Sequence, residues 1–172
     1  MEAAVALQRQ HDIPAAAIEA VEVTTFHEAT RLAIRRPRNT EEAQYSLPYP
    51  VAAAGHLGAG EVTAPFDNAH VLRLADAVEM AEDDEMNRVF PSQRLASVAL
   101  RLADGRRLES SVVPARGDPE APLSTAELTA KFHDFADAVV GSAAAAAIEA
   151  SVFGDDAGWV DRVLAGSTEP AG

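Results

Sequence analysis

The segment from Arg94 to Val113 constrains the fold of this chain more than any other part of the sequence. Alternate positions of its first arm are apolar, namely Ala96, Val98, Leu100 and Leu102. Polar Ser97 and Arg101 take positions between them, which is the period of a half-buried strand. Asp104-Gly105 then supplies a turn that tolerates positive φ. Residues 106–113 are therefore expected to pair back as the second arm of a β-hairpin.

A further strand is predicted near the start of the chain. Val21, Val23 and Thr25 alternate with Glu22 and Thr24, so residues 18–26 have the period of a strand with one buried face. Together with the hairpin, this strand can form one small antiparallel sheet.

A helix is predicted to begin at Asn39, because Asn39 and Glu42 resemble a capping box. The helical pattern continues toward residue 56, but Pro48 and Pro50 lie inside it. Proline cannot donate a backbone hydrogen bond and crowds the preceding turn of a helix. The helix over residues 39–56 is therefore expected to be kinked or split in two.

Another helix is predicted over residues 68–82, where Val71, Ala75 and Val78 recur at helical spacing. The remaining helices are expected over residues 2–10, 124–140, 142–151 and 156–164, the second of them starting at a Ser124–Glu127 capping box. The order of these elements predicts an α+β domain: a small antiparallel sheet of the early strand and the later hairpin, with helices packed on one face.

The length of 172 residues predicts one domain that can bury a core without disulfides or metals. We expect this domain to span residues 1–166 and a flexible tail to follow at 167–172. No capping residue stands before the helix at residues 2–10. That segment is therefore expected to be the remnant of an upstream helix.

Composition excludes several classes of function. The net charge of −13 opposes binding to nucleic acid, whose phosphates are also negative. Without cysteine there is no disulfide, thiolate metal site or cysteine nucleophile. No apolar run reaches the roughly 18 residues of a membrane span, and the acidic Met1-Glu2 start does not resemble a signal peptide. We expect a soluble, cytoplasmic protein that does not bind a membrane.

Tyr45, Tyr49 and His56 form the first candidate binding site. They lie at i, i+4 and i+11 of the predicted kinked helix, which puts their polar ends roughly along one stripe. Such a stripe could line a cleft and donate hydrogen bonds to a bound carboxylate. The same spacing also fits tyrosines that pack in a core with their hydroxyls bonded to backbone.

Basic residues concentrate in one place, at Arg31, Arg35, Arg36 and Arg38. The planar guanidinium suits bidentate pairing with carboxylates, so Arg31 and Arg35 are candidates to bind a small polyanion. An exposed face or a subunit contact is the alternative. No two of the five histidines stand at i, i+3 or i+4, and a local histidine metal site is therefore not expected.

Three segments resemble, in order, the C-terminal part of the MmgE/PrpD family. They are EAQYSLPYPVAAA at residues 42–54, Phe90-Pro91 before a strand ending in LADGR at 102–106, and RGDPEAPLS at 116–124 continuing to Lys131-Phe132. The resemblance implies a smaller α+β domain of cofactor-independent lyases and isomerases that act on small polycarboxylates. Family members include 2-methylcitrate dehydratase and cis-aconitate decarboxylase, and they form homodimers with a large helical domain.

The resemblance also implies roles for residues. The tyrosine of the family's Ser-x-x-Tyr element is Tyr49 here, as a hydrogen-bond donor to substrate or a wall of the pocket. The same comparison gives Tyr45 and Gln44 a supporting role. The family's acid/base lysines and histidines lie mostly in its helical domain, which this sequence does not contain, and Lys131 matches a packing element instead.

Three hypotheses follow. The chain is the C-terminal part of a 2-methylcitrate dehydratase-like lyase of propionate metabolism that needs a separate helical half and is inactive by itself. Alternatively, it is a non-catalytic remnant retained for dimerisation, or a free-standing carboxylate-binding module that uses Arg31, Arg35 and Tyr49. Without a helical domain to cover it, apolar surface is left exposed, so self-association as a homodimer is expected.

Overall fold

The computed structural model describes residues 2–57, 65–119, 121–154, 158 and 160. The chain divides into two compact units, residues 1–122 and 123–172, and each is described by itself. The predicted tail at 167–172 lies outside the described residues, and so does most of the predicted helix over 156–164. The prediction of one domain over residues 1–166 stays a prediction.

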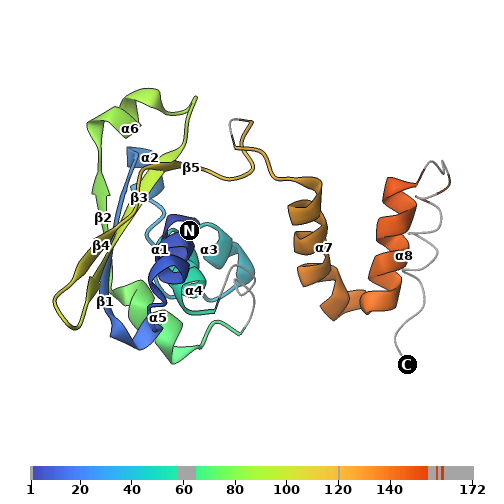
Figure 1. The fold of residues 1–172 in the computed structure, drawn as a ribbon, viewed down its shortest axis with the longest axis horizontal. Coiled ribbons are helices and arrows are strands. Elements are labelled where there is room, and N and C mark those ends of the chain that lie inside the picture. The colour runs from blue at the N-terminus through green and yellow to red at the C-terminus, as the bar shows by residue number, and fades with distance from the viewer. Residues whose placement is uncertain (1, 58–64, 120, 155–157, 159, 161–172) are drawn as a thin grey trace. The chain divides into compact units, whose positions relative to one another are not determined.

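The first unit combines short helices with a five-stranded sheet (Figure 1). Its helices are α1 (Glu2–His11), the 3-10 turn η1 (Ala15–Ala17), α2 (His27–Thr30), α3 (Thr40–Gln44), α4 (Pro48–Leu57), α5 (Ala69–Asp76) and α6 (Asp84–Val89). Its strands are β1 (Ile18–Thr25), β2 (Val78–Glu82), β3 (Leu95–Leu102), β4 (Arg107–Glu109) and β5 (Val113–Pro114).

The strand order is β2-β1-β3-β4, and β5 also pairs with β3. The predicted early strand and hairpin are confirmed: β1 and β4 both run antiparallel to β3, and Gly105 in the hairpin turn has φ +85°. The second arm is interrupted between β4 and β5, where the Ser110 hydroxyl accepts a hydrogen bond from the Val98 N–H at 3.0 Å. The α+β class is therefore confirmed, with a small sheet that contains the predicted hairpin, although its second arm is interrupted.

The sheet is mixed rather than wholly antiparallel, because β2 pairs parallel to β1. The predicted helix over residues 68–82 is wrong in its second half: α5 ends at Asp76 and residues 78–82 form β2. The Ala77 carbonyl accepts a hydrogen bond from Val21 N–H at 3.2 Å, so the chain joins the sheet there. Val78 then lies beside Val21 in the parallel register. Strand pairing outweighs the helical spacing of Val71, Ala75 and Val78.

Helices α1 and α5 lie against the apolar face of the sheet, and α4 packs against both of them (Figure 1). The inner sheet residues of this core are Val21, Val23, Val78, Val98, Leu100 and Leu102. Leu7 of α1, Val51 of α4 and Leu74 of α5 pack in the same buried cluster. Burial of these side chains is the main stabilising contribution to the unit.

The alternate residues of the sheet carry charges. Glu22 of β1 pairs with Arg107 of β4 at 2.8 Å and with Arg101 of β3 at 3.7 Å. Hydrogen bonds to Glu22 and then Glu109 raise the pKa of the Arg107 guanidinium. One face of the sheet is therefore apolar and covered by helices, while the other carries cross-strand ion pairs, as period-two alternation requires.

The second unit is a helical hairpin of α7 (Thr125–Val140) and α8 (Ser142–Phe153). The predicted capping box is confirmed, because Ser124 caps the Glu127 N–H and the Glu127 carboxylate accepts from the Ser124 N–H. Gly141, at φ +82°, turns the chain between the two helices. A side chain at this φ would be strained, so glycine is the residue that suits this turn.

Candidate functional site

The residues predicted to bind a carboxylate lie in the segment from Arg31 to Leu57. Asn39 begins α3, with its side-chain oxygen accepting from the Glu42 N–H at 2.8 Å. The helix stops at Tyr45, whose backbone leaves the helical region at φ −91° and ψ 41°. Pro48 then opens α4, a position where its missing N–H costs nothing. Of the two predicted outcomes, a kink or a split, the structure shows the split into two helices.

Ser46 lies between α3 and α4 and hydrogen-bonds the loop before α3 to the first turn of α4. Its hydroxyl donates to the Ile34 carbonyl at 2.5 Å and accepts from the Tyr49 N–H at 3.1 Å. One residue on, the Leu47 N–H donates to the Leu32 carbonyl at 2.8 Å. The serine of the Ser-x-x-Tyr element is thus a buried structural residue. The sequence signal for this role is a serine two residues before Pro48, the first residue of α4, because serine commonly caps the start of a helix.

The two tyrosines have opposite environments because the helix breaks between them. Tyr49 is only 2% exposed and its ring lies edge-on to Phe66, with centroids 5.8 Å apart. Tyr45 is 66% exposed. The stripe predicted along the kinked helix is therefore not formed by this pair. His56 is in the last turn of α4, and its side chain lies outside the described residues.

Arg35 and Arg36 fasten the segment to the end of α5. Arg35 Nη1 donates to the Ala75 carbonyl at 2.6 Å and to the Asp76 carbonyl at 3.1 Å. Arg36 pairs with the Asp76 carboxylate at 2.5 Å, and this hydrogen bond raises the pKa of the Arg36 guanidinium. Cations at a helix C-terminus are stabilised by its partial negative charge. Both side chains already have a structural role.

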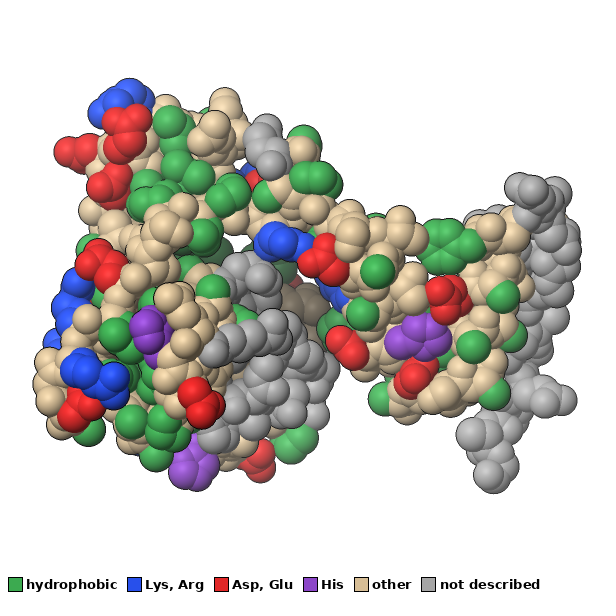
Figure 2. Space-filling model, in the orientation of Figure 1, with side chains coloured by type: hydrophobic (Ala, Val, Ile, Leu, Met, Phe, Trp, Pro, Cys, Tyr) green, Lys and Arg blue, Asp and Glu red, His purple; other side chains and the backbone are tan. Residues whose placement is uncertain are grey.

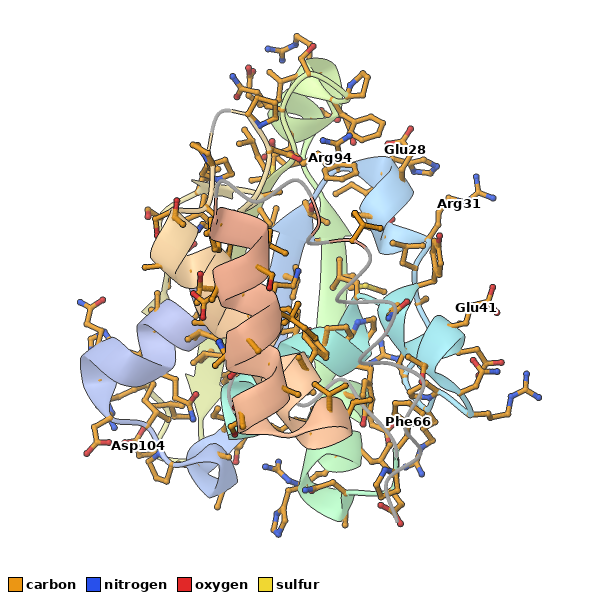
Figure 3. The ribbon with its side chains drawn as sticks, turned by 90° about the vertical axis from the view of Figure 1, so that its right-hand side faces the viewer. Glu28, Arg31, Glu41, Phe66, Arg94 and Asp104 are labelled. Atoms are coloured by element: carbon orange, nitrogen blue, oxygen red, sulfur yellow. The ribbon has the colours of Figure 1, made fainter. Side chains whose placement is uncertain are left out.

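The other two arginines of the cluster differ from each other. Arg38 forms a bidentate contact with Glu42, including an Nη2–Oε1 distance of 2.5 Å, and the hydrogen bond from Arg38 lowers the pKa of the Glu42 carboxyl. Arg31 is exposed and points away from the fold (Figure 3). Of Arg31 and Arg35, the two arginines predicted to bind a polyanion, Arg31 is the one with an exposed side chain.

The structure also brings together His27 and Glu82, which sequence reasoning missed. They stand just after β1 and at the end of β2, with His27 Nδ1 2.8 Å from Glu82 Oε1. The His27 N–H donates to Asn87 Oδ1 at 2.6 Å, and the hydrogen bond from His27 lowers the pKa of the Glu82 carboxyl. Parallel strands end at the same edge of a sheet, so His27 and Glu82 meet because residues 78–82 form a strand and not the predicted helix.

A small pocket lies where β3 begins. It has a volume of about 210 Å³ and is lined by Gln93, Arg94, Leu95, Pro114 and Asp118. Arg94 (labelled in Figure 3) is paired with Asp118 at 2.9 Å. Because each charge neutralises the other, the pocket offers an incoming carboxylate no unpaired cation from this pair.

Within the residues that the structure describes, no three His, Asp or Glu side chains are grouped so as to ligate a metal ion. None of the helices in the described part of the chain is both long and apolar enough to cross a bilayer.

Two comparisons with known proteins bear on identity. A search of the curated proteins finds no match to the chain. The family model for the MmgE/PrpD C-terminal domain matches residues 1–154, which covers the sheet, the Tyr49 segment and both helices of the second unit. The resemblance carried by the three sequence segments is thereby confirmed, and the chain belongs to the MmgE/PrpD family through its C-terminal domain.

Proposed function

We propose that this chain is the C-terminal part of a cofactor-independent, 2-methylcitrate dehydratase-like lyase that acts on small polycarboxylates. The observation that carries the proposal is the family match over residues 1–154. The class of substrate and the lyase chemistry come from the resemblance to the family.

We also propose that catalysis needs a helical half of the same family. The resemblance puts most of the family's acid/base residues in that domain. The arrangement of the predicted site residues supports the proposal: Tyr49 is buried, Tyr45 is exposed, and Arg35 is bound to the end of α5. These side chains do not by themselves surround a substrate.

In the assembled enzyme, Tyr49 is proposed as a wall of the pocket or a hydrogen-bond donor to substrate. Ser46 and Phe66 fix its backbone and ring, which is the kind of support that a positioned donor requires. Arg31 is better placed than Arg35 to meet a polycarboxylate, because it is exposed and Arg35 is engaged. Tyr45 and His56 remain proposed substrate contacts.

Reconstitution tests this proposal. The chain is purified alone and together with the helical domain of a 2-methylcitrate dehydratase, and loss of water from 2-methylcitrate is followed by the ultraviolet absorbance of the unsaturated product. We expect turnover in the mixture and none with either part alone. Turnover by the isolated chain would contradict the need for a helical half, and an inactive but stably associated mixture would contradict the lyase assignment.

The Tyr49→Phe variant sharpens the test. It removes one hydroxyl from a buried ring and keeps the packing against Phe66. If the hydroxyl donates to the reacting substrate, kcat falls by about 100-fold, the usual cost of losing such a donor. Ser92→Ala, at an exposed position outside the proposed site, is the control and should change kcat less than about threefold. Equal effects of the two substitutions would remove Tyr49 from the site.

A non-catalytic dimerisation domain is the second candidate, favoured by one observation. Phe135 and Val139 of α7 are 51% and 82% exposed, and exposed apolar clusters mark interaction sites. We propose a homodimer, with light scattering as its test. A dimer mass that reverts to monomer mass in Val139→Glu is expected, and monomer mass for the wild-type chain at all concentrations would exclude it.

A further inference from the structure

His133 of α7 lies between two carboxylates. Its Nδ1 is 2.8 Å from Asp137 Oδ1 and its Nε2 is 2.9 Å from Glu149 Oε2. On the face of the second unit shown in Figure 2, a histidine side chain has acidic side chains beside it. The first contact stays within α7, whereas the second joins α7 to α8.

Both contacts require hydrogens on the ring. An ionised carboxylate only accepts hydrogen bonds, so each ring nitrogen must carry a proton to satisfy its partner. Neutral imidazole has one N–H and would turn a lone pair toward the other carboxylate. The geometry therefore fits the doubly protonated imidazolium. Hydrogen bonds to Glu149 and then Asp137 accordingly raise the pKa of His133.

Asp137 has a second donor, whereas within the described residues His133 is the side chain that bonds to Glu149. The Ser142 hydroxyl donates to Asp137 Oδ2 at 2.9 Å, and hydrogen bonds from His133 and then Ser142 lower the pKa of Asp137. The further charged groups on α7 are Glu127, Lys131 and Asp134, and Glu149 is the titratable residue of α8. A neutral ring keeps one N–H, and the proton facing Asp137 is the less costly one to lose, because Asp137 keeps the Ser142 donor. Loss of the ring's positive charge then weakens the contact with Glu149, across the two helices, from an ion pair to an ordinary hydrogen bond.

The apolar contact between these helices is thin. Among the described residues of the second unit, Ala145 is the buried hydrophobic side chain. An open apolar groove of about 680 Å³ runs along the pair, lined by residues that include Phe132, Phe135 and Val139 of α7 and Ile148 of α8. A polar contact between the helices matters more where so little apolar surface is covered.

We propose that His133 is a pH-dependent latch that holds α8 against α7. In its imidazolium form it bridges Asp137 and Glu149. When Nδ1 releases its proton to solvent, the ring loses its positive charge, the contact of Nε2 with Glu149 weakens and the hairpin loosens about the turn at Gly141.

The sign of the effect follows from the direction of the pKa shift. The folded pKa of His133 lies above its ordinary value of 6.5. The stabilisation is therefore fully present below pH 6.5 and is lost as pH rises through the raised pKa. The hairpin is therefore closed at mildly acidic pH and loosens as the pH rises.

Nuclear magnetic resonance of the full chain tests the latch. The ring signals of His133, identified by their absence in His133→Gln, should titrate above the ordinary pKa of 6.5. Amide exchange across residues 142–153, corrected for intrinsic rates, should lose about threefold protection on the alkaline side, the order expected for one partly exposed ion pair. Titration of His133 at the ordinary value would overturn the proposal.

Glu149→Gln is the matched variant, because it keeps the shape of the side chain and removes its charge. We expect the pKa of His133 to fall toward its ordinary value and the protection of α8 to be low and nearly independent of pH. Protection of α8 that matches the wild-type chain on both sides of the titration would overturn the latch. The wild-type titration needs no variant, so a folding defect in Glu149→Gln leaves the proposal testable.

Discussion

The helices of residues 1–122 and those of residues 123–172 are stabilised by different interactions. Helix α5 buries Val71, Leu74 and Ala75 against the sheet. In α7 none of the described side chains is buried, and its stability comes from a capping box and from the contacts of His133. Burial is insensitive to pH and costly to lose, whereas caps and ion pairs are individually small and depend on protonation.

A core truncation tests this comparison most strongly. Leu100→Ala removes a fully buried side chain of β3 and should lower the free energy of unfolding of the first unit by about 2–5 kcal/mol. Urea denaturation followed by circular dichroism measures the change. Leu128→Ala, at a half-exposed position of α7, is the matched control and should cost less than about 0.5 kcal/mol. Similar costs for both would break the comparison.

The next effect concerns Ser46. Ser46→Ala leaves the Ile34 carbonyl without its donor and the Tyr49 N–H without its acceptor. We expect a loss of about 1–3 kcal/mol in the first unit, the cost of unpaired buried groups. The control is Ser92→Ala at an exposed position. If urea midpoints of the two variants agree, Ser46 does not join Arg31–Arg35 to α4.

Removing the cap of α7 tests the comparison in the second unit, where caps contribute more than burial. Ser124→Ala should destabilise α7 by about 1 kcal/mol, because both hydrogen bonds of the capping box involve this residue. Hydrogen exchange resolves the two units: protection should fall over residues 125–140 and stay unchanged in β1 and β3. A parallel loss in the strands would show that the two units unfold together.

The smallest effect expected is a shift in titration. Hydrogen bonds from Arg38 hold the pKa of Glu42 below its ordinary value of 4.5, so their contribution is present above that pH and lost as pH falls through the lowered pKa. Arg38→Gln should return the pKa of Glu42 toward 4.5, as measured by carboxyl carbon chemical shifts. Titration of the Glu42 carboxyl at the same pH in the variant and in the wild-type chain would contradict this pairing.

Much of the fold was predictable where local signals and tertiary pairing agree. The alternation in β1 and β3, the Asp104-Gly105 turn and the Ser124 cap each specify one local structure. Residues 78–82 carry two periods at once, because Val78 continues the helical spacing of α5 and also starts a strand alternation with Met80. Whether residues 78–82 form a helix or a strand depends on their pairing with β1. That partner is distant in sequence, so local periodicity does not reveal it.

The candidate site was less predictable for a related reason. Helical spacing puts Tyr45 and Tyr49 on one stripe only if the helix is continuous, and the break before Pro48 sends one outward and one inward. The arginines could be recognised as a cluster, but the partners of Arg35 and Arg36 lie about 40 residues away at the end of α5. Which charges are engaged was therefore set by contacts distant in sequence.

The outer strands of the sheet have a consequence for how the chain behaves at high concentration. An unpaired strand edge is a template on which another chain can extend a sheet and aggregate. Here β2 at one side bears Glu79 and Glu82, and at the other β4 is short and charged while β5 ends in Pro114, which has no N–H to donate. Growth of the sheet into fibrils is opposed at both sides by charge, brevity and proline.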